Sequence, residues 1–426
     1  MTARIPGMLS VRQKFPESKP VNIRAAVRSG FETEAILTRI KPGMRIAVAV
    51  GSRGITNLRA VVESILDVLK TAGAQPFIIP AMGSHGGATP EGQADLLREY
   101  GVSEDQLKVP IRASMEVERI GATPDGVDVY LSVEALKADG IVVVNRVKPH
   151  TDFSGTIGSG ILKMIVIGLG KRVGAATFHA AASHRGYEHT IRSISSVSLQ
   201  AAPILCGVAI VENQFHDTAR IAVFKSEEIA RREEEIFVES KNLMPRLPFD
   251  EIDFLIIDRI GKNISGAGMD PNITGRGVHG YSSFLGDTDQ SKPRIRRIFV
   301  RDLTPETHGN GIGIGFADFT TSRLVRGMDH NVTAINALTS LTPQGAKIPI
   351  HFETDREAIT QALISLALPD IRQARVVRIA DTLSLGHLEV SEAYSEMINK
   401  KENLMATSVI GEMKFDVSGN LMPIGE

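Results

Sequence analysis

The sequence predicts an α/β protein made of two α/β domains with mostly parallel sheets and with the active site in the crevice between the domains. Short apolar segments alternate with helical segments, which is the pattern of a parallel sheet. The chain has 426 residues, which is long for a single domain. A proline-punctuated segment, 244–249, separates two series of such elements and is the candidate domain boundary. We therefore expect an N-terminal domain over 1–246 and a C-terminal domain over 250–426.

The first series begins with an apolar strand over 45–50 and a helix over 57–70, whose apolar residues recur at helical spacing. A second strand covers 76–82. Thr89 and Pro90 then begin a helix, with threonine as the N-cap and proline in the first turn. Further strands are expected at 127–131, 140–147 and 204–211, and further helices at about 187–201 and at 227–242. The last of these is a charged amphipathic helix and is assigned to a solvated face.

The second series contains expected strands at 253–258, 297–301 and 376–380 and a helix at 354–367. Glycine occupies alternate positions between Gly309 and Gly315, which would leave one face of a strand bare. Such a face would serve either tight packing or a ligand. His308 and Asn310 are therefore candidate site residues.

Composition excludes several classes of function. Lys and Arg total 48 and Asp and Glu total 49, a balance that argues against broad binding of nucleic acid or of anionic membranes. Cys206 is the only cysteine, so an intramolecular disulfide and an all-cysteine metal cage are excluded. The sequence has neither the apolar core of a signal peptide nor an apolar stretch of transmembrane length, which predicts a cytoplasmic protein.

Three residues that can act on an anionic substrate follow expected strands. Arg53, His85 and His150 each lie just past a strand end, and in a parallel sheet those ends share the edge where ligands bind. Two facing histidines can exchange the roles of proton donor and proton acceptor. The guanidinium of Arg53 can bind a carboxylate through two hydrogen bonds. The structural alternative is that each is an ordinary exposed loop residue.

The segment after His150 adds candidate cofactor-binding residues. Gly158 and Gly160 would permit close approach of the backbone to a phosphate, and Lys163 follows them. The segment is neither a P-loop nor a complete dinucleotide fingerprint. His179 follows as a possible single metal ligand.

These residues resemble the nickel-dependent lactate racemase family, whose members use a nickel-pincer nucleotide derived from nicotinic acid. The matching segments follow the family's order through most of the N-terminal half: 51–53, 83–85, 121–130, 148–150 and 163–179. The resemblance implies an isomerase, a racemase or epimerase of 2-hydroxy acids. The N-terminal domain would hold the cofactor and catalyse the reaction, and the C-terminal domain would close the substrate cleft. Partners would be a chiral hydroxy acid and the enzymes that make the cofactor.

The resemblance also implies roles for individual residues. Lys163 would tether the cofactor through a thioamide, and His179 would bind nickel in a square-planar site completed by cofactor donors. His85 and His150 would be the acid/base pair, and Arg53 would hold the substrate carboxylate. The α-hydrogen would leave the substrate as hydride, giving a transient 2-keto acid, and would return to its other face.

The second half should contribute a basic residue that contacts the substrate, either Lys262 or Arg276. The sequence departs from the family at Val50 and Gly51, at the glycine after His85, in a longer gap between His150 and Lys163, and in having no tryptophan. The substrate is therefore open between lactate and another hydroxy acid, such as a larger sugar acid. Two alternatives are a carrier or sensor of the pincer nucleotide without racemase activity, and a metal-independent sugar-acid enzyme on the same fold.

Overall fold

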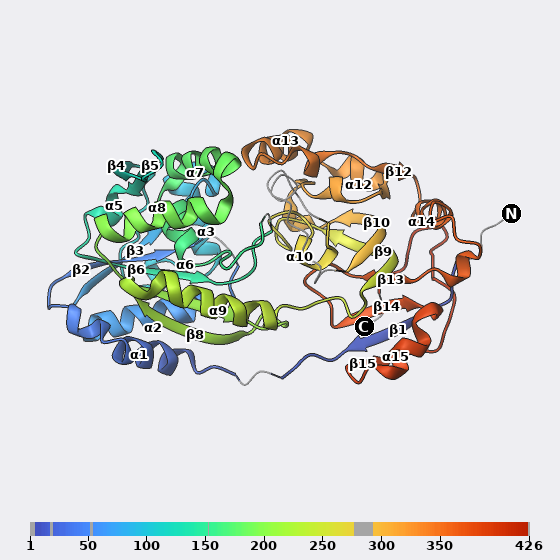
Figure 1. The fold of residues 1–426 in the computed structure, drawn as a ribbon, viewed down its shortest axis with the longest axis horizontal. Coiled ribbons are helices and arrows are strands. Elements are labelled where there is room, and N and C mark those ends of the chain that lie inside the picture. The colour runs from blue at the N-terminus through green and yellow to red at the C-terminus, as the bar shows by residue number, and fades with distance from the viewer. Residues whose placement is uncertain (1–4, 18–19, 52–53, 152, 277–292, 425–426) are drawn as a thin grey trace. The chain divides into compact units, whose positions relative to one another are not determined.

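The computed structural model describes residues 5–17, 20–51, 54–151, 153–276 and 293–424 (Figure 1). The chain forms two compact units, one of residues 18–244 and the other of residues 1–17 with 245–426. The boundary at 244/245 falls in the proline-punctuated segment. The first residues differ from the expected division, because the strand β1 (Met8–Gln13) pairs with β14 (His387–Ser391) in the sheet of the C-terminal unit.

The unit of residues 18–244 is built on a sheet in the order β3-β2-β6-β7-β8. The first four strands run parallel, and β8 is antiparallel to β7. A separate hairpin is formed by β4 and β5. The strands are β2 (Arg45–Val50), β3 (Gln75–Pro80), β4 (Val117–Ala122), β5 (Asp128–Ser132), β6 (Gly140–Arg146), β7 (Ile204–Glu212) and β8 (Thr218–Lys225).

The helices of this unit cover the sheet and carry the candidate site. A core of Ile46, Val48 and Val50 on β2 packs against apolar residues of α1 and α2, which lie side by side (Figure 1). A π-helical turn (Met164–Gly168) follows α6 directly. The helices are α1 (Ile23–Thr33), α2 (Leu58–Thr71), α3 (Pro90–Glu99), α4 (Glu104–Leu107), α5 (Val133–Leu136), α6 (Ile161–Lys163), α7 (Lys171–Arg185), α8 (Tyr187–Ala201) and α9 (Ile229–Leu243).

The other unit has a sheet in the order β12-β11-β10-β9-β13-β14-β1-β15. The strands from β12 to β13 run parallel, and β14, β1 and β15 continue the sheet in antiparallel fashion. The elements not yet given are β9 (Glu251–Ile260), α10 (Pro271–Thr274), β10 (Arg294–Leu303), β11 (Phe319–Thr321), α12 (Ser322–Gly327), α13 (His330–Thr339), β12 (Ile350–Phe352), α14 (Asp355–Ile364), β13 (Val376–Ile379), α15 (Ser395–Lys400) and β15 (Leu404–Ala406). The predicted class, α/β with mostly parallel sheets, is confirmed.

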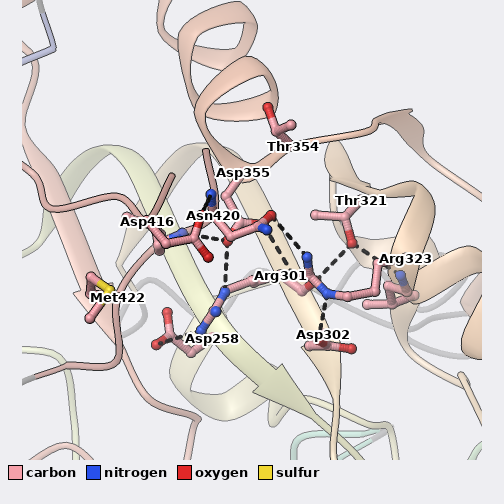
Figure 2. Close-up of polar contacts among 12 residues, drawn as sticks. Asp258, Arg301, Asp302, Thr321, Arg323, Thr354, Asp355, Asp416, Asn420 and Met422 are labelled. Atoms are coloured by element: carbon pink, nitrogen blue, oxygen red, sulfur yellow. Dashed lines mark hydrogen bonds and ion pairs between the residues drawn. The ribbon is translucent and has the colours of Figure 1, made fainter. Parts of the chain in front are cut away.

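Buried charged side chains form hydrogen bonds with the backbone of the C-terminal segment of this second unit (Figure 2). The carboxylate of Asp355, which is fully buried, accepts hydrogen bonds from Arg301 at 2.8 Å and Arg323 at 3.2 Å. It also accepts the backbone N–H of Leu421 at 2.8 Å. The guanidinium of Arg378 donates to the backbone oxygen of Met422 at 2.6 Å. The last described residues are thus held by charged groups on several elements.

The expected strand around Gly309–Gly315 is wrong. This segment forms turns, and Gly313 adopts a φ of +95°. A Cβ at Gly313 would lie 1.9 Å from the backbone oxygen of Ala267, so this glycine permits contact between two backbones. Tight packing therefore accounts for it. Among the described residues, no helix is long and apolar enough to cross a bilayer.

Candidate functional site

Two of the three candidate residues, His85 and His150, lie in loops at the same edge of the first sheet. The strands β3, β2 and β6 are parallel neighbours in that order. His85 lies in the loop after β3, and His150 lies in the loop after β6. Arg53, in the segment after β2, lies outside the described residues. Because the strands are parallel and adjacent, the loops that carry His85 and His150 flank the end of β2.

Lys163 and His150 are in direct contact. The amine Nζ of Lys163 lies 2.5 Å from the imidazole Nε2 of His150, and it also donates to the hydroxyl of Ser159 at 3.4 Å. Lys148 and Ser159 exchange backbone hydrogen bonds of 2.8 and 2.9 Å, which close the loop between them. Because these hydrogen bonds join the two ends of the loop, Lys163 lies next to His150 although a long segment separates them in sequence.

His179 on α7 joins the same cluster through Tyr187, the first residue of α8. The phenol oxygen of Tyr187 lies 3.3 Å from Nδ1 of His179. The ring of Tyr187 also lies 5.1 Å from the ring of His150, stacks on Phe153 at 4.8 Å and meets Phe178 edge-on at 5.0 Å. Tyr187 therefore packs against both histidines. The sequence gives no periodic signal for this contact, because Gly186 breaks the helix between His179 and Tyr187.

The cluster keeps His179 uncharged. Burial, and secondly the charge of Lys163, lower the pKa of His179 from 6.5 to about 4. A neutral imidazole has a lone pair that can bind a metal ion, whereas an imidazolium does not. With Nδ1 next to Tyr187, the remaining ring nitrogen, Nε2, is the candidate donor atom. Within the described residues, no three His, Cys, Asp or Glu side chains are grouped so that they could hold a metal ion.

A buried carboxyl group supports the turn that carries Lys163. Glu233 of α9 is fully buried, and its Oε2 accepts the backbone N–H of Leu162 at 2.9 Å. Its Oε1 has no hydrogen-bond partner among the described atoms. Burial raises the pKa of Glu233 from 4.5 to about 7. The solvated face expected for this helix is therefore wrong at Glu233, because α9 places one acidic residue on its inner face together with Ile229, Ile236 and Phe237.

The two candidate glycines are packed against protein atoms. A Cβ at Gly158 would lie 2.5 Å from the backbone oxygen of Lys148, and a Cβ at Gly160 would lie 2.2 Å from Oε1 of Glu233. Both glycines are thus required for close packing of the loop. Contact of their backbone with a phosphate stays a prediction.

The candidates of the C-terminal unit lie on two neighbouring loops. The backbone N–H of Lys262 donates to the hydroxyl of Thr307 at 3.1 Å, and that hydroxyl donates to the backbone oxygen of Asn310 at 2.8 Å. The amine of Lys262 donates to the backbone oxygen of Gly266 at 2.8 Å. His308, between Thr307 and Asn310, is exposed and has a φ of +49°. These loops follow the parallel neighbours β9 and β10, so Lys262, His308 and Asn310 share one sheet edge.

Arg276, the alternative to Lys262, is engaged in a structural ion pair. Its guanidinium lies 2.7 Å from a carboxylate oxygen of Asp318. It also donates to the backbone oxygens of Ile295 and Arg296, at 3.4 and 3.3 Å. This ion pair favours Lys262 over Arg276 as the basic residue that would contact a substrate.

Comparisons with known proteins point to one family. Residues 5–190 match the lactate racemase N-terminal domain. The lactate racemase apoprotein from Thermoanaerobacterium thermosaccharolyticum is similar in structure, with a TM-score of 0.52 and 14% sequence identity over 89% of this chain and 99% of that chain. At this identity the likeness concerns the fold.

A Thermotoga maritima protein is a weaker structural match, with a TM-score of 0.44, 16% identity, and coverage of 57% of this chain and 65% of that chain. No curated protein matches the chain by sequence. The family match thus covers residues 5–190 of this chain, and the structural likeness to the lactate racemase apoprotein extends the fold over most of the remainder.

Proposed function

We propose that this protein is a racemase or epimerase of 2-hydroxy acids that works with a nickel-pincer nucleotide. The observation that carries the proposal is the cluster of Lys163, His150 and His179, joined by a 2.5 Å contact and by the ring of Tyr187. The match of residues 5–190 to the lactate racemase N-terminal domain supports the reaction class. When bound, the nucleotide would accept the substrate's α-hydrogen as hydride and return it.

The residues present fit this cofactor. His179 is held as a neutral imidazole, which suits a single protein ligand to Ni²⁺ whose other donors come from the nucleotide. The charge of Lys163 lowers the pKa of His179, so a nucleotide tethered to Lys163 would lie near a metal ion bound to His179. The buried Glu233 fixes the backbone turn that presents the lysine.

The histidines would move the hydroxyl proton. In the protein without cofactor, the hydrogen bond between Lys163 and His150 requires one donor and one acceptor, so one of these nitrogens offers a lone pair to a proton on the other. Converting the amine into a thioamide leaves its nitrogen uncharged. His150 then can take the proton of a substrate hydroxyl, and His85, on the other side of β2, would serve the opposite enantiomer.

Arg53 is the candidate carboxylate-binding residue of the N-terminal unit, and Lys262 is the candidate basic residue of the C-terminal unit that would contact a substrate. His308 and Asn310 would also contact the substrate. Because two loops of one sheet edge carry Lys262, His308 and Asn310, they would set which hydroxy acid fits. The substrate would therefore depend on these two loops, and a panel of hydroxy acids is the way to identify it.

The test is an assay of the full chain, co-expressed with the enzymes that make the cofactor, against a panel of chiral 2-hydroxy acids that includes lactate and sugar acids. Chiral chromatography should show interconversion of the enantiomers or epimers of at least one acid. A preparation that carries nickel and a lysine adduct but converts none of them would contradict the proposal and favour a carrier of the nucleotide.

A further inference from the structure

A buried lysine at the start of α7 is unexplained by the proposed chemistry. Lys171 is almost fully buried, and its backbone adopts a φ of +54°, which is uncommon for a residue with a side chain. Its amine donates to the backbone oxygen of Pro80 at 2.6 Å and to Oε1 of Gln93 at 3.1 Å. Burial lowers the pKa of Lys171 from 10.5 to about 8. A buried cation and a strained backbone are both costly, so other contacts must fix them in place.

Gln93 connects this lysine to the loop that carries His85. Gln93 lies on α3 and is fully buried. Its Oε1 accepts from Lys171, while its Nε2 donates to the backbone oxygens of Gly83 at 3.0 Å and His85 at 3.2 Å. The side-chain amide of Gln93 thus accepts a hydrogen bond from Lys171 and donates hydrogen bonds to the loop. Glutamine suits this position because it has both kinds of group, whereas glutamate has only acceptors.

The connected elements carry the candidate catalytic residues. Lys171 begins α7, which carries His179, and the π-helical turn before it follows Lys163 directly. The same turn contacts the loop, because the backbone N–H of Gly83 donates to the oxygen of Gly168 at 3.2 Å. The loop of His85 is therefore bonded to the segment between Lys163 and His179 at two points.

We infer that Lys171 and Gln93 are positioning residues that hold the His85 loop against the start of the helix that carries His179. The role of this arrangement in catalysis rests on the proposed function, in which His85 transfers a proton while Lys163 and His179 hold the cofactor. The hydrogen bonds themselves do not depend on that function.

Gln93→Glu separates this role from simple core packing. The carboxylate keeps the size of the side chain and still accepts from Lys171, but it cannot donate to the oxygens of Gly83 and His85. Gln13→Glu is the matched control, since Gln13 is also buried and its Nε2 donates to the backbone oxygen of Arg246; both residues belong to the C-terminal unit, which does not contain the His85 loop. Lys171→Met is a second variant that removes the amine and keeps much of the volume.

The experiment compares amide hydrogen exchange of the full-length protein in peptides covering 82–89, where the amides of Gly83, His85 and Ala88 are hydrogen-bonded. We expect exchange there to rise at least about tenfold in Gln93→Glu and in Lys171→Met, and to stay at the wild-type level in Gln13→Glu, with circular dichroism unchanged. When the two variants carry nickel and the cofactor, their kcat should be lower than that of the wild type, while KM should change by a smaller factor. Their nickel content should equal that of the wild type.

Wild-type exchange rates in both variants would overturn the inference. Faster exchange with an unchanged kcat in an enzyme that needs His85 would overturn the positioning role in catalysis. If the wild-type protein converts no hydroxy acid while the exchange result holds, the proposed function fails and the loop-holding role stands.

Discussion

The amine of Lys163 lies 2.5 Å from the imidazole of His150, although the two residues are 13 positions apart and lie on either side of a long loop. The backbone bridge between Lys148 and Ser159 brings them together. A lysine that attacks a cofactor must lose a proton, and the contact places a nitrogen that can accept a proton next to the amine. This contact makes Lys163 the strongest candidate for covalent attachment of a cofactor.

Replacing Lys163 with methionine should have two effects. The cofactor adduct seen by intact mass in the wild type should disappear. The pKa of His179 should rise from about 4, because the nearby positive charge is removed, but it should stay below 6.5 because burial is the larger cause. NMR titration of the cofactor-free variant measures this shift. An adduct that persists in Lys163→Met would refute the attachment site.

His179 should be required for the metal ion. His179→Ala removes the neutral imidazole, so nickel measured by mass spectrometry should fall to a small fraction of the wild-type content in protein prepared in parallel. His184→Ala is the matched control, because His184 is exposed on the same helix. Equal nickel contents in the two variants would show that His179 has only a structural role.

His85 and His150 should each be needed for turnover but not for metal binding. Loss of one general acid or base typically costs about 10²–10⁴-fold in rate, so either alanine variant should lose kcat by that order and keep its nickel. A deuterium label on the α-carbon of the substrate should remain largely on that carbon in the product. Complete loss of the label to solvent would mean that the carbon is deprotonated instead.

The four parallel strands of the first sheet were predictable because they have strong local signals, whereas β8 was not predicted. Apolar segments ending in glycine-containing loops predicted β2, β3 and β6, and Thr89 caps α3 as expected, accepting a hydrogen bond from the N–H of Gly92. The order β3-β2-β6 was not predicted and comes from the structure. Placing the loops of His85 and His150 at one edge needed no more than the pattern of parallel strands.

Long-range contacts were not predictable from the same signals. The strand β1 is short and joins the sheet of the other unit, so its partner is decided by packing and not by neighbours in sequence. In the sequence Glu233 is one of many charged residues on α9, and nothing in the sequence indicates its contacts with Gly160 and Leu162. Tyr187 likewise contacts both histidines through the bend at Gly186.

Glu233 should make stability depend on pH near neutrality. Its pKa is about 7 in the folded protein and close to 4.5 when the chain is unfolded, so between these values the folded state binds more protons. The contribution of Glu233 to the free energy of unfolding should therefore be largest below pH 4.5 and should decline as the pH rises to 7. Glu233→Gln is neutral at every pH and can still accept the N–H of Leu162, so this decline should be absent.

Urea titrations of both proteins at pH 5.5 and pH 8 test the effect of Glu233. The variant should gain stability relative to the wild type as the pH rises, whereas Glu235→Gln should not, since Glu235 is an exposed residue of the same helix paired with Arg231. Other titrating groups contribute equally to the wild type and the variant, so the difference between the two isolates Glu233. If that difference is the same at both pH values, the buried carboxyl does not titrate in this range, and the turn that presents Lys163 is insensitive to pH.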